Sequence, residues 1–532
     1  MTYEAIEALL KRRLITALAL LVVVTALAYG GSLKNGFVWD DHYIVEQYPL
    51  NRNLGNLPQF FLLSDSISGW AAAPYYRPLA RATYAFDYRM FGLNPWGYHL
   101  VNFLVHLANV LLLFFVARAL FKEVLPALLA AAIFAVHAGA AEPVFAIFAR
   151  NSLMALFFML ATFLAFRRGM PTGRSRWLIP AAFLFLLGLL SKETVLMLLP
   201  VLAWYCRTEK IPVKGMILRL LPLLAAAAVY LLLRRNALSE VLPALQPETV
   251  GARLATTIYL IPRYLLLLVW PARLTVLHEI PTQLQAWFPY LLACCLVLLA
   301  GIVAVARYGG KPLKFGLLWG VCALAPVIGF IATPGAPLAE RHLYAPLAGF
   351  ALVIAGLAVA LLRRSRAAGV GVIGIMLLLL TARTAERGSD WRSDVTLFQS
   401  ALTVNPSSST AHFNLGNAYQ GDANTAAAIR EWQIVIRIEP RAQDALNQLG
   451  KQLILDGRSL EALICFERAV AAHPESFESL NNLAVAQDLL DRSAEAIASY
   501  QRALALVPPE RLDAVPRLRQ RIELLRTRAA KP

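Results

Sequence analysis

Three copies of one pattern fill the C-terminal part of this chain, and they decide its fold there. The copies read STAHFNLGNAYQGDANTAAAIREWQIVIRIEP at 409–440, QDALNQLGKQLILDGRSLEALICFERAVAAHP at 443–474 and FESLNNLAVAQDLLDRSAEAIASYQRALALVP at 477–508. Each copy ends in a proline, and with Pro406 before them the prolines 406, 440, 474 and 508 are spaced by 34 residues. A fixed period of this length predicts stacked helical hairpins.

Small and aromatic residues recur at fixed places in these copies, in the tetratricopeptide pattern. The small residues let the two helices of a repeat approach closely, and the aromatics fill the space between repeats. We expect a repeat domain over 383–532, with repeats at about 409–442, 443–476 and 477–510, a preceding half repeat with Phe398 and Ala401, and a basic capping helix near 511–528. The pattern residues are Leu415, Gly416, Tyr419, Ala428 and Trp432; Leu449, Gly450, Leu453, Ala462, Phe466 and Ala469; and Leu483, Ala484, Gln487, Ala496, Tyr500 and Ala503.

The chain as a whole is far more apolar than a soluble protein. Of its 532 residues, 58% are hydrophobic and 16% are charged, against about 45–50% and about 25% in soluble domains. The excess has to lie in lipid, which excludes a soluble, disordered or fibrous chain. The net charge of +17 comes from Lys and Arg clusters between apolar runs, as the positive-inside bias predicts. It does not indicate nucleic-acid binding, because no basic stripe interleaved with aromatics occurs. The five cysteines form neither a disulfide framework nor a metal site.

Apolar runs predict a membrane domain over 1–382 with about 11–12 hydrophobic segments. A cleaved signal peptide is the alternative for the first run, because Ala26-Leu27-Ala28 fits the small-residue rule, but the many later runs favour an uncleaved span. Several runs are shorter than the roughly 20 residues that a helix needs to cross hydrocarbon. The runs are 14–27, 99–121, 125–138, 143–166, 177–190, 194–206, 216–233, 253–270, 288–306, 314–332, 343–362 and 368–382.

Basic clusters between the runs indicate their orientation. Counting back from the last cluster puts residues 383–532 outside, whereas counting forward from a cytoplasmic N-terminus through every run puts them inside. The clusters favour the first count, and the segment that would then not cross fully is 253–270, with Arg263 in mid-run. The clusters are Arg167, Arg168, Arg174 and Arg176; Arg207, Lys210 and Lys214; Arg307, Lys311 and Lys314; and Arg363, Arg364 and Arg366.

The long loop 34–98 between the first two runs is polar and aromatic and is expected to face outward. It carries Trp39-Asp40-Asp41-His42. Two adjacent carboxylates can serve as a general base or bind a hard cation; a solvated acid that caps a helix is the alternative. Arg77, in Tyr75-Tyr76-Arg77-Pro78-Leu79, can hold a phosphate in bidentate fashion, or can be an interfacial anchor.

Ionisable and tyrosine side chains inside or beside later apolar runs are further candidates. A charge at the bilayer centre costs roughly 2.5–3.5 kcal/mol on insertion scales, so each needs a reason. Snorkelling or local ion pairing is the alternative, but a shared external location favours one wet polar cleft. No nucleotide, zinc-hydrolase or redox motif occurs in a convincing context. The candidates are His137, Glu142, Arg150, Lys192, Glu193, Glu340, Arg341 and Tyr344.

Longer stretches around these residues carry a resemblance. The first-loop stretches are Asn35-Gly36-Phe37-Val38-Trp39-Asp40-Asp41-His42, Tyr76-Arg77-Pro78-Leu79 and Gly92-Leu93-Asn94-Pro95-Trp96-Gly97-Tyr98-His99-Leu100-Val101-Asn102. Later ones are His137, Glu142 and Arg150; Ser191-Lys192-Glu193; Ala339-Glu340-Arg341-His342-Leu343-Tyr344 with Pro346; and Asp390-Trp391. Together they resemble the transmembrane-and-tetratricopeptide-repeat O-mannosyltransferases, a family of GT-C membrane glycosyltransferases. Ala138 and Ala149 stand where that family usually has Pro and Gly.

The resemblance implies an all-α fold: a polytopic GT-C membrane domain followed by a tetratricopeptide solenoid. It implies transfer of mannose or another hexose from a polyprenyl-phosphate carrier to a hydroxyl acceptor, such as protein Ser or Thr, on the external face. By position, Asp40 is the catalytic aspartate and Asp41 the second candidate. Arg341 or Arg77 would stabilise the departing phosphate, with Lys192 and Arg150 in reserve, and single displacement would invert the anomeric centre. A divalent metal is left open, with Asp40 and Asp41 as its ligands if it is used.

Two other function classes stay open. A membrane-anchored tetratricopeptide scaffold for envelope assembly would need a single anchor, whereas about 380 residues here form membrane structure. A transporter or polysaccharide flippase would move its substrate without a new glycosidic bond. We expect the repeats to bind a protein acceptor or partner in their concave groove. Because Ala530-Lys531-Pro532 is no ER-retention signal, we expect a bacterial inner membrane with the repeats on the external, periplasmic side.

Overall fold

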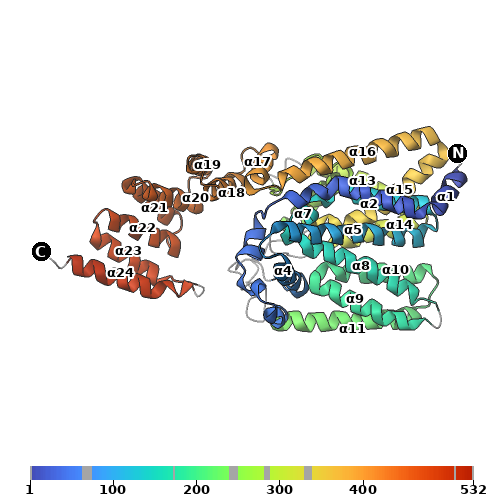
Figure 1. Ribbon diagram of the computed structural model, residues 1–532, viewed down its shortest axis with the longest axis horizontal. Coiled ribbons are helices and arrows are strands. Elements are labelled where there is room, and N and C mark those ends of the chain that lie inside the picture. The colour runs from blue at the N-terminus through green and yellow to red at the C-terminus, as the bar shows by residue number, and fades with distance from the viewer. Residues whose placement is uncertain are drawn as a thin grey trace. The chain divides into compact units, whose positions relative to one another are not determined.

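The computed structural model describes residues 3–62, 75–171, 174–238, 250–280, 288–328, 338–508 and 511–529. Within these ranges every regular element is a helix, which confirms the predicted all-α fold (Figure 1). The chain divides into two compact units, Met1–Ser393 and Asp394–Pro532. The boundary predicted after residue 382 would fall inside the helix α16 (Arg366–Asp390), whereas the observed boundary follows Ser393. The reason is that the apolar run ends near 382, but the helix continues through a polar stretch.

The first unit is built around long apolar helices. Seven of its described helices are long and apolar enough to cross a membrane, or eight with the pair 124–136 and 138–145, which bends by 58°. Their burial within the protein differs: 72% of the apolar window in Ile147–Arg168 is buried, but only 6% of that in Pro289–Tyr308. Apolar faces of this extent are stable against lipid rather than water. The seven are Leu14–Lys34, Pro95–Phe121, Ile147–Arg168, Val213–Leu238, Pro289–Tyr308, Tyr344–Arg364 and Arg366–Asp390.

Every predicted run holds a helix in its described part, but the helices at 3–12, 57–62 and 78–91 lie outside the runs, and the run 143–166 is divided between two helices. The helices of the first unit are α1 (Tyr3–Arg12), α2 (Leu14–Tyr29), α3 (Leu57–Leu62), α4 (Pro78–Phe91), α5 (Pro95–Phe121), α6 (Val124–Val136), α7 (Ala141–Phe145), α8 (Arg150–Arg168), α9 (Leu178–Ser191), α10 (Leu198–Thr208), α11 (Val213–Leu238), α12 (Val250–Val269), α13 (Phe288–Tyr308), α14 (Lys311–Leu324), α15 (Tyr344–Arg364) and α16. Short 3₁₀ segments join several of them, among them η9 (Glu193–Met197) and η12 (Glu340–His342).

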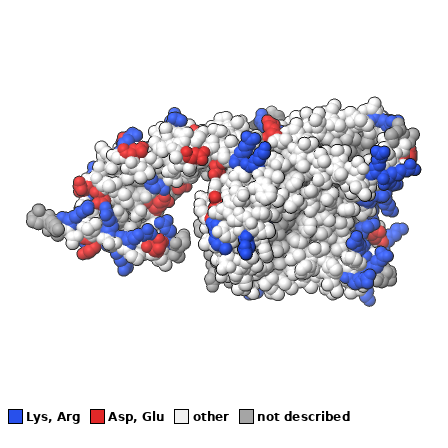
Figure 2. All heavy atoms as spheres, in the orientation of Figure 1, with Lys and Arg blue, Asp and Glu red and all other residues white. Residues whose placement is uncertain are grey.

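Lys and Arg side chains gather at one end of this unit, where Figure 2 shows a dense blue group. α5, α8, α10 and α15 end there, each with a basic last turn, and α14 begins there. Ion pairs join these helix ends: Lys311 with Glu209, and Arg363 with Glu123 at 3.0 Å. We call this the basic end, and the opposite end, where α4 and α7 lie, the loop end. The positive-inside bias predicts that the basic end faces the cytoplasm.

α11 and α12 both finish at the loop end. α11 leaves the basic end, and the ring of Tyr230 in its second half lies 6.1 Å from the ring of Tyr76 at the loop end. α12 also finishes at the loop end, because the main-chain oxygen of Leu268 accepts a 2.8 Å hydrogen bond from His137, the residue after α6. Residues 239–249, which lead into α12, lie outside the described part of the chain, so the expectation that 253–270 does not cross fully stays a prediction.

The second unit is a stack of helical hairpins, one in each predicted repeat. Where the pattern places a small residue opposite an aromatic, the contact is close: a Cβ on Gly416 would lie 2.6 Å from Trp432, and one on Gly450 would lie 2.5 Å from Phe466. The close packing of the two helices in these repeats thus requires a glycine opposite the aromatic ring. Its helices are α17 (Asp394–Val404), α18 (Ser409–Gly421), α19 (Thr425–Ile438), α20 (Gln443–Leu455), α21 (Ser459–Ala472), α22 (Phe477–Leu489), α23 (Ser493–Ala505) and α24 (Ala514–Ala529).

Candidate functional site

The turn after α2 presents two neighbouring acids from a strained backbone. Trp39 has a φ of +52°, a conformation that is unusual for a bulky residue and persists only where its surroundings hold it. Its ring meets the ring of Phe148 edge-on, with 5.5 Å between centroids. The turn is therefore a fixed support for Asp40 and Asp41 rather than a solvated loop.

Asp41 is completely buried and is held by main-chain N–H groups. Its Oδ1 accepts a hydrogen bond from Phe148 at 2.7 Å, and its Oδ2 accepts one from Val38 at 3.2 Å. Burial raises the pKa of Asp41 to about 7, while these hydrogen bonds and one from Ile147 oppose the rise. The carboxylate of Asp41 thus ties the first-loop turn to the segment before α8, which is a positioning task.

Asp40 has a different environment, since it is partly exposed and its nearest charges are side chains. Burial raises the pKa of Asp40 to about 6, the guanidinium of Arg341 lowers it, and the carboxylate of Glu142 raises it. A carboxylate with a pKa near 6 is ionised at neutral pH and yet more basic than an ordinary aspartate. These are the properties that a general base requires.

Arg341 on η12 and Glu142 on α7 form a close pair. Glu142 accepts two hydrogen bonds from Arg341, a 2.6 Å bond from the guanidinium and a 2.7 Å bond from the main-chain N–H. Glu142 is buried, but 21% of the Arg341 side chain is exposed. The guanidinium also lies 5.8 Å from the ring of Phe148, which gives a cation–π contact. Arg341 is thus fixed in direction while part of it stays accessible to a ligand.

Arg77 and Glu193 form a second pair, beside Lys192. The guanidinium of Arg77 donates to both carboxylate oxygens of Glu193, at 2.8 and 3.2 Å, and lies 4.0 Å from the ring of Tyr75. Burial alone would raise the pKa of Glu193, but Arg77 outweighs it and the pKa falls to about 2. Lys192 donates to Ser152 at 3.0 Å, and burial, followed by the charge of Arg77, lowers the pKa of Lys192 to about 7.

Electrostatic interactions join these groups into one site. Lys192 interacts with Arg77 and Glu193 and also with Arg341 and Glu142, while Arg341 interacts with Asp40. Three acidic and three basic side chains from five separate segments of the chain therefore lie in one neighbourhood, where the positive side chains can neutralise a phosphate. We call the following residues the charged cluster: Asp40, Arg77, Glu142, Lys192, Glu193 and Arg341.

Arg150, predicted as a reserve phosphate ligand, belongs to a separate buried network. It is fully buried, pairs with Asp87 at 2.5 Å and donates to Asn102, Thr83 and the main-chain oxygen of Tyr98. Its Nε, Nη1 and Nη2 atoms each donate a hydrogen bond, and the ion pair with Asp87 neutralises its charge. Arg150 therefore ties α8 to α4 and α5 and has little capacity left for a ligand.

His137 and Tyr344 also have structural partners. His137 accepts a hydrogen bond from the N–H of Gly139 at Nδ1, so that its Nε2 carries the proton donated to Leu268. Tyr344 is fully buried, and its hydroxyl accepts from Asn109 at 3.0 Å and bonds Nδ1 of His106 at 2.8 Å. Both ring nitrogens of His137 and the hydroxyl group of Tyr344 are therefore occupied by these hydrogen bonds.

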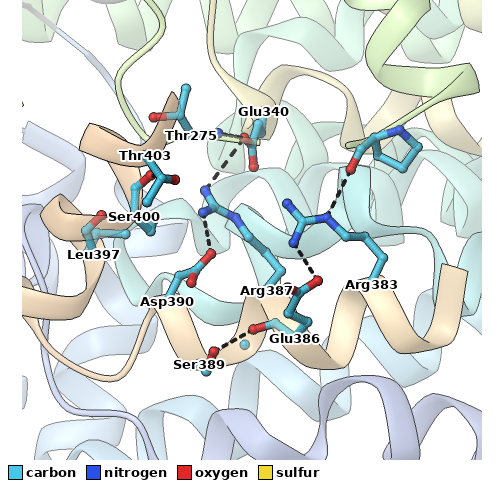
Figure 3. Close-up of polar contacts among 12 residues, drawn as sticks. Thr275, Glu340, Arg383, Glu386, Arg387, Ser389, Asp390, Leu397, Ser400 and Thr403 are labelled. Carbon is cyan, nitrogen blue, oxygen red and sulfur yellow. Dashed lines mark hydrogen bonds and ion pairs between the residues drawn. The ribbon is translucent and has the colours of Figure 1, made fainter. Parts of the chain in front are cut away.

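Glu340 lies in a buried group at the end of α16, shown in Figure 3. Its Oε1 accepts a hydrogen bond from the N–H of Thr275 at 2.5 Å and lies 3.6 Å from Nη2 of Arg387. Arg387 is fully buried and donates to Asp390 at 2.7 Å. Glu340 and its neighbour Arg341 thus belong to two different networks.

A metal site receives little support from the described residues. Within them, no three His, Cys, Asp or Glu side chains lie close enough together to hold a metal ion. A cation shared by Asp40 and Asp41 would compete with the main-chain donors of Phe148 and Val38 for the oxygens of Asp41.

Some residues of the site gave no signal in the sequence. Phe148 contributes a main-chain N–H to Asp41 and a ring to Trp39 and Arg341, yet in the sequence it is one apolar residue in an apolar run. Ser152 and Asp87, the partners of Lys192 and Arg150, were not predicted either. Asp87 could have been noticed, because it is an acid on the apolar side of α4.

Known proteins resemble this chain along most of its length. The family described as dolichyl-phosphate-mannose-protein mannosyltransferase matches residues 74–238. The chain is 27% identical over 463 residues to "Protein O-mannosyl-transferase TMTC3" of Mus musculus, which covers 77% of this chain and 50% of that protein. It is 27% identical over 442 residues to "Protein O-mannosyl-transferase F38B6.6" of Caenorhabditis elegans. This alignment covers 79% of this chain and 62% of that protein. The chain therefore spans about half to two thirds of the length of these curated relatives.

Solved structures also align with it. ArnT from Cupriavidus metallidurans bound to undecaprenyl phosphate is 13% identical, with a TM-score of 0.36, and the alignment covers 93% of this chain and 81% of that one. MamA is 17% identical, with a TM-score of 0.20, and the alignment covers 30% of this chain and 88% of that one.

Proposed function

The chain resembles the transmembrane-and-tetratricopeptide-repeat O-mannosyltransferases, and on this premise we propose that it is a membrane glycosyltransferase. It moves mannose or another hexose from a polyprenyl-phosphate carrier to a hydroxyl group, that of a protein Ser or Thr. The observation that carries the proposal is the position of Asp40, a carboxylate of raised pKa beside the guanidinium of Arg341. A base next to a cation suits a reaction that removes a proton from an alcohol and releases a phosphate.

Asp40 acts as the general base in a single displacement. The acceptor O–H gives its proton to the carboxylate of Asp40 while its oxygen forms a bond to the anomeric carbon. The bond between that carbon and the phosphate oxygen breaks, and its electron pair leaves with the polyprenyl phosphate. Attack and departure on opposite faces invert the anomeric centre. A positioned base contributes about 10²–10⁴-fold to the rate of such a step.

Arg341, Arg77 and Lys192 stabilise the phosphate. Arg341 and Arg77 are directed by Glu142 and Glu193, with 21% and 14% of their side chains exposed, so they can bind without reorganising. Lys192 is buried beneath them with a pKa of about 7, and the negative phosphate favours its protonated form. The cost of placing cations in this buried site is offset when the phosphate arrives.

The reaction takes place on the external side of the membrane, at the loop end. The gathering of Lys and Arg at the basic end supports a cytoplasmic basic end and an external charged cluster (Figure 2). α16 runs toward the loop end and leads into the repeats, which supports an external repeat unit. There the hairpin stack recruits an extended segment of the acceptor protein.

The test uses purified full-length protein in liposomes with polyprenyl-phosphate mannose and Ser/Thr peptides. We expect labelled mannose on the peptide and loss of transfer by about 10²-fold or more in Asp40→Asn, with membrane insertion intact. Glu386→Gln is the matched control, because Glu386 is an exposed acid of the same unit that pairs with Arg383 on its own helix. Full transfer by Asp40→Asn would remove the proposed base. Carrier flux across sealed vesicles without a new glycosidic bond would indicate a flippase, and loss of function only in repeat-groove variants would indicate a scaffold.

A further inference from the structure

Two consecutive residues of η12 are held by two different partners. Arg341 binds Glu142 on α7 through its main chain and its guanidinium, whereas the side chain of Glu340 binds the N–H of Thr275 and approaches Arg387 on α16. η12 spans three residues. A 3₁₀ turn of this length has little stability of its own, so its anchors decide its orientation.

The anchor on the α16 side is a buried ionic group. Glu340 and Arg387 have no exposed surface, and His278 lies 3.5 Å from the same Glu340 oxygen. Asp390 completes the group with a 2.7 Å bond from Arg387. Without Arg387, the carboxylate of Glu340 would be a buried anion without its guanidinium, and η12 would have to move to hydrate it.

We propose that Arg387 is a positioning residue for glycosyl transfer. By binding Glu340, it fixes η12 so that the guanidinium of the adjacent Arg341 is presented to the lipid phosphate. The inference rests on the proposed function, because it assigns Arg341 to that phosphate. It adds a residue on α16 whose ion pairs, with Glu340 and Asp390, lie outside the charged cluster and which acts through one peptide unit of η12.

α16 itself supplies a matched control, seen beside Arg387 in Figure 3. Arg383 lies one turn earlier and donates to the main-chain oxygens of Pro271 and Ala272 and to Glu386. It therefore ties α16 to the segment before Thr275, much as Arg387 does, but it makes no contact with η12 in these bonds. Arg383→Met removes a comparable side chain and charge from the same helix.

The experiment measures the KM for polyprenyl-phosphate mannose, kcat and the melting temperature for Arg387→Met, Arg387→Lys, the double variant Arg387→Met/Glu340→Gln and Arg383→Met. We expect Arg387→Met to raise the KM about tenfold or more and to change kcat less. The double variant removes the uncompensated charge, so it regains melting temperature but keeps the raised KM. Arg387→Lys restores part of the affinity, and Arg383→Met leaves the KM within about twofold of the wild type.

Recovery of KM together with melting temperature in the double variant would mean that the pair is only structural, and would overturn the inference. A second readout does not depend on catalysis: a cryo-EM structure of Arg387→Met should show η12 displaced and the bond between Arg341 and Glu142 lengthened, with both unchanged in Arg383→Met. If η12 keeps its place in Arg387→Met, the inference is wrong. Wild-type protein that transfers no sugar would contradict the proposed function, and this structural arm would still decide the role of Arg387.

Discussion

The main-chain N–H of Phe148 donates a 2.7 Å hydrogen bond to the carboxylate of Asp41, 107 residues earlier in the chain. This bond fastens the first-loop turn to the segment before α8, and the contact between Trp39 and Phe148 supports it on the other side. One acid of the pair thereby holds the turn, which leaves the other, Asp40, beside Arg341. In the proposed function the two adjacent carboxylates therefore have different tasks: Asp41 holds the turn and Asp40 supplies the base.

Asp41→Asn is expected to reduce stability more than it reduces chemistry. An asparagine has one acceptor oxygen, so its NH₂ group would face either Phe148 or Val38, and a buried donor would lose its partner. The loss should lower the free energy of unfolding by about 1–3 kcal/mol. Melting temperatures in detergent should fall in Asp41→Asn and stay close to wild type in Asp40→Asn, with the order of effects reversed for transfer. An unchanged melting temperature with abolished transfer in Asp41→Asn would make Asp41 the base instead.

The rate of transfer is expected to rise with pH through about 6. Asp40 must be ionised to accept the proton, and its pKa is raised to about 6, so kcat is low below that pH and level above it. Arg341 lowers the pKa of Asp40, so Arg341→Gln should move this limb of the kcat profile to higher pH. The position of the limb is the readout, because the variant also weakens phosphate binding. If the limb keeps its position in Arg341→Gln, the guanidinium of Arg341 does not influence the pKa of the catalytic base.

Binding of the donor is expected to weaken as pH rises through about 7. Burial lowers the pKa of Lys192 to about 7, so its positive charge is present below that pH and lost above it. The KM for the polyprenyl-phosphate sugar should therefore increase on the alkaline side. Lys192→Met should give a high KM that does not change through this range, and Lys192→Arg a low one. A wild-type KM that is constant from pH 6 to about 8.5 would exclude Lys192 as a phosphate ligand.

Sequence patterns could predict those parts of the protein that depend on period and composition. The repeats follow from the 34-residue spacing of their prolines and of their small and aromatic residues, and the long helices follow from apolar runs. Arg341 could be named because a charge beside an apolar run needs a reason, and Asp40 because it is one of two adjacent carboxylates in a long polar loop. The end of the membrane unit could not be placed, because α16 continues as a helix after its apolar run has ended.

The division of labour among the candidates could not be read from residue type. Arg150 and Arg341 are equivalent in the sequence, yet Arg150 is neutralised by Asp87 and fully buried, whereas Arg341 remains partly exposed. The difference lies in partners far away in the chain, which no local pattern reveals. The support for Asp41 comes from the main-chain N–H of Phe148, which carries no side-chain signal at all.

Gly450→Ala should disturb the repeat unit and leave the charged cluster intact. A Cβ at this position would lie 2.5 Å from the ring of Phe466, so α20 and α21 would have to move apart. Overpacking of this kind costs about 1–3 kcal/mol. Gly421→Ala is the matched control, since no atom lies within 4 Å of a Cβ built there. In the full-length protein, limited proteolysis should cut the repeats faster in Gly450→Ala than in Gly421→Ala.

Because the charged cluster lies in the other unit, binding of undecaprenyl phosphate should be the same in both variants, while transfer to a protein acceptor should fall in Gly450→Ala alone. Equal transfer to protein and to a short free peptide in Gly450→Ala would show that the repeats do not recruit the acceptor.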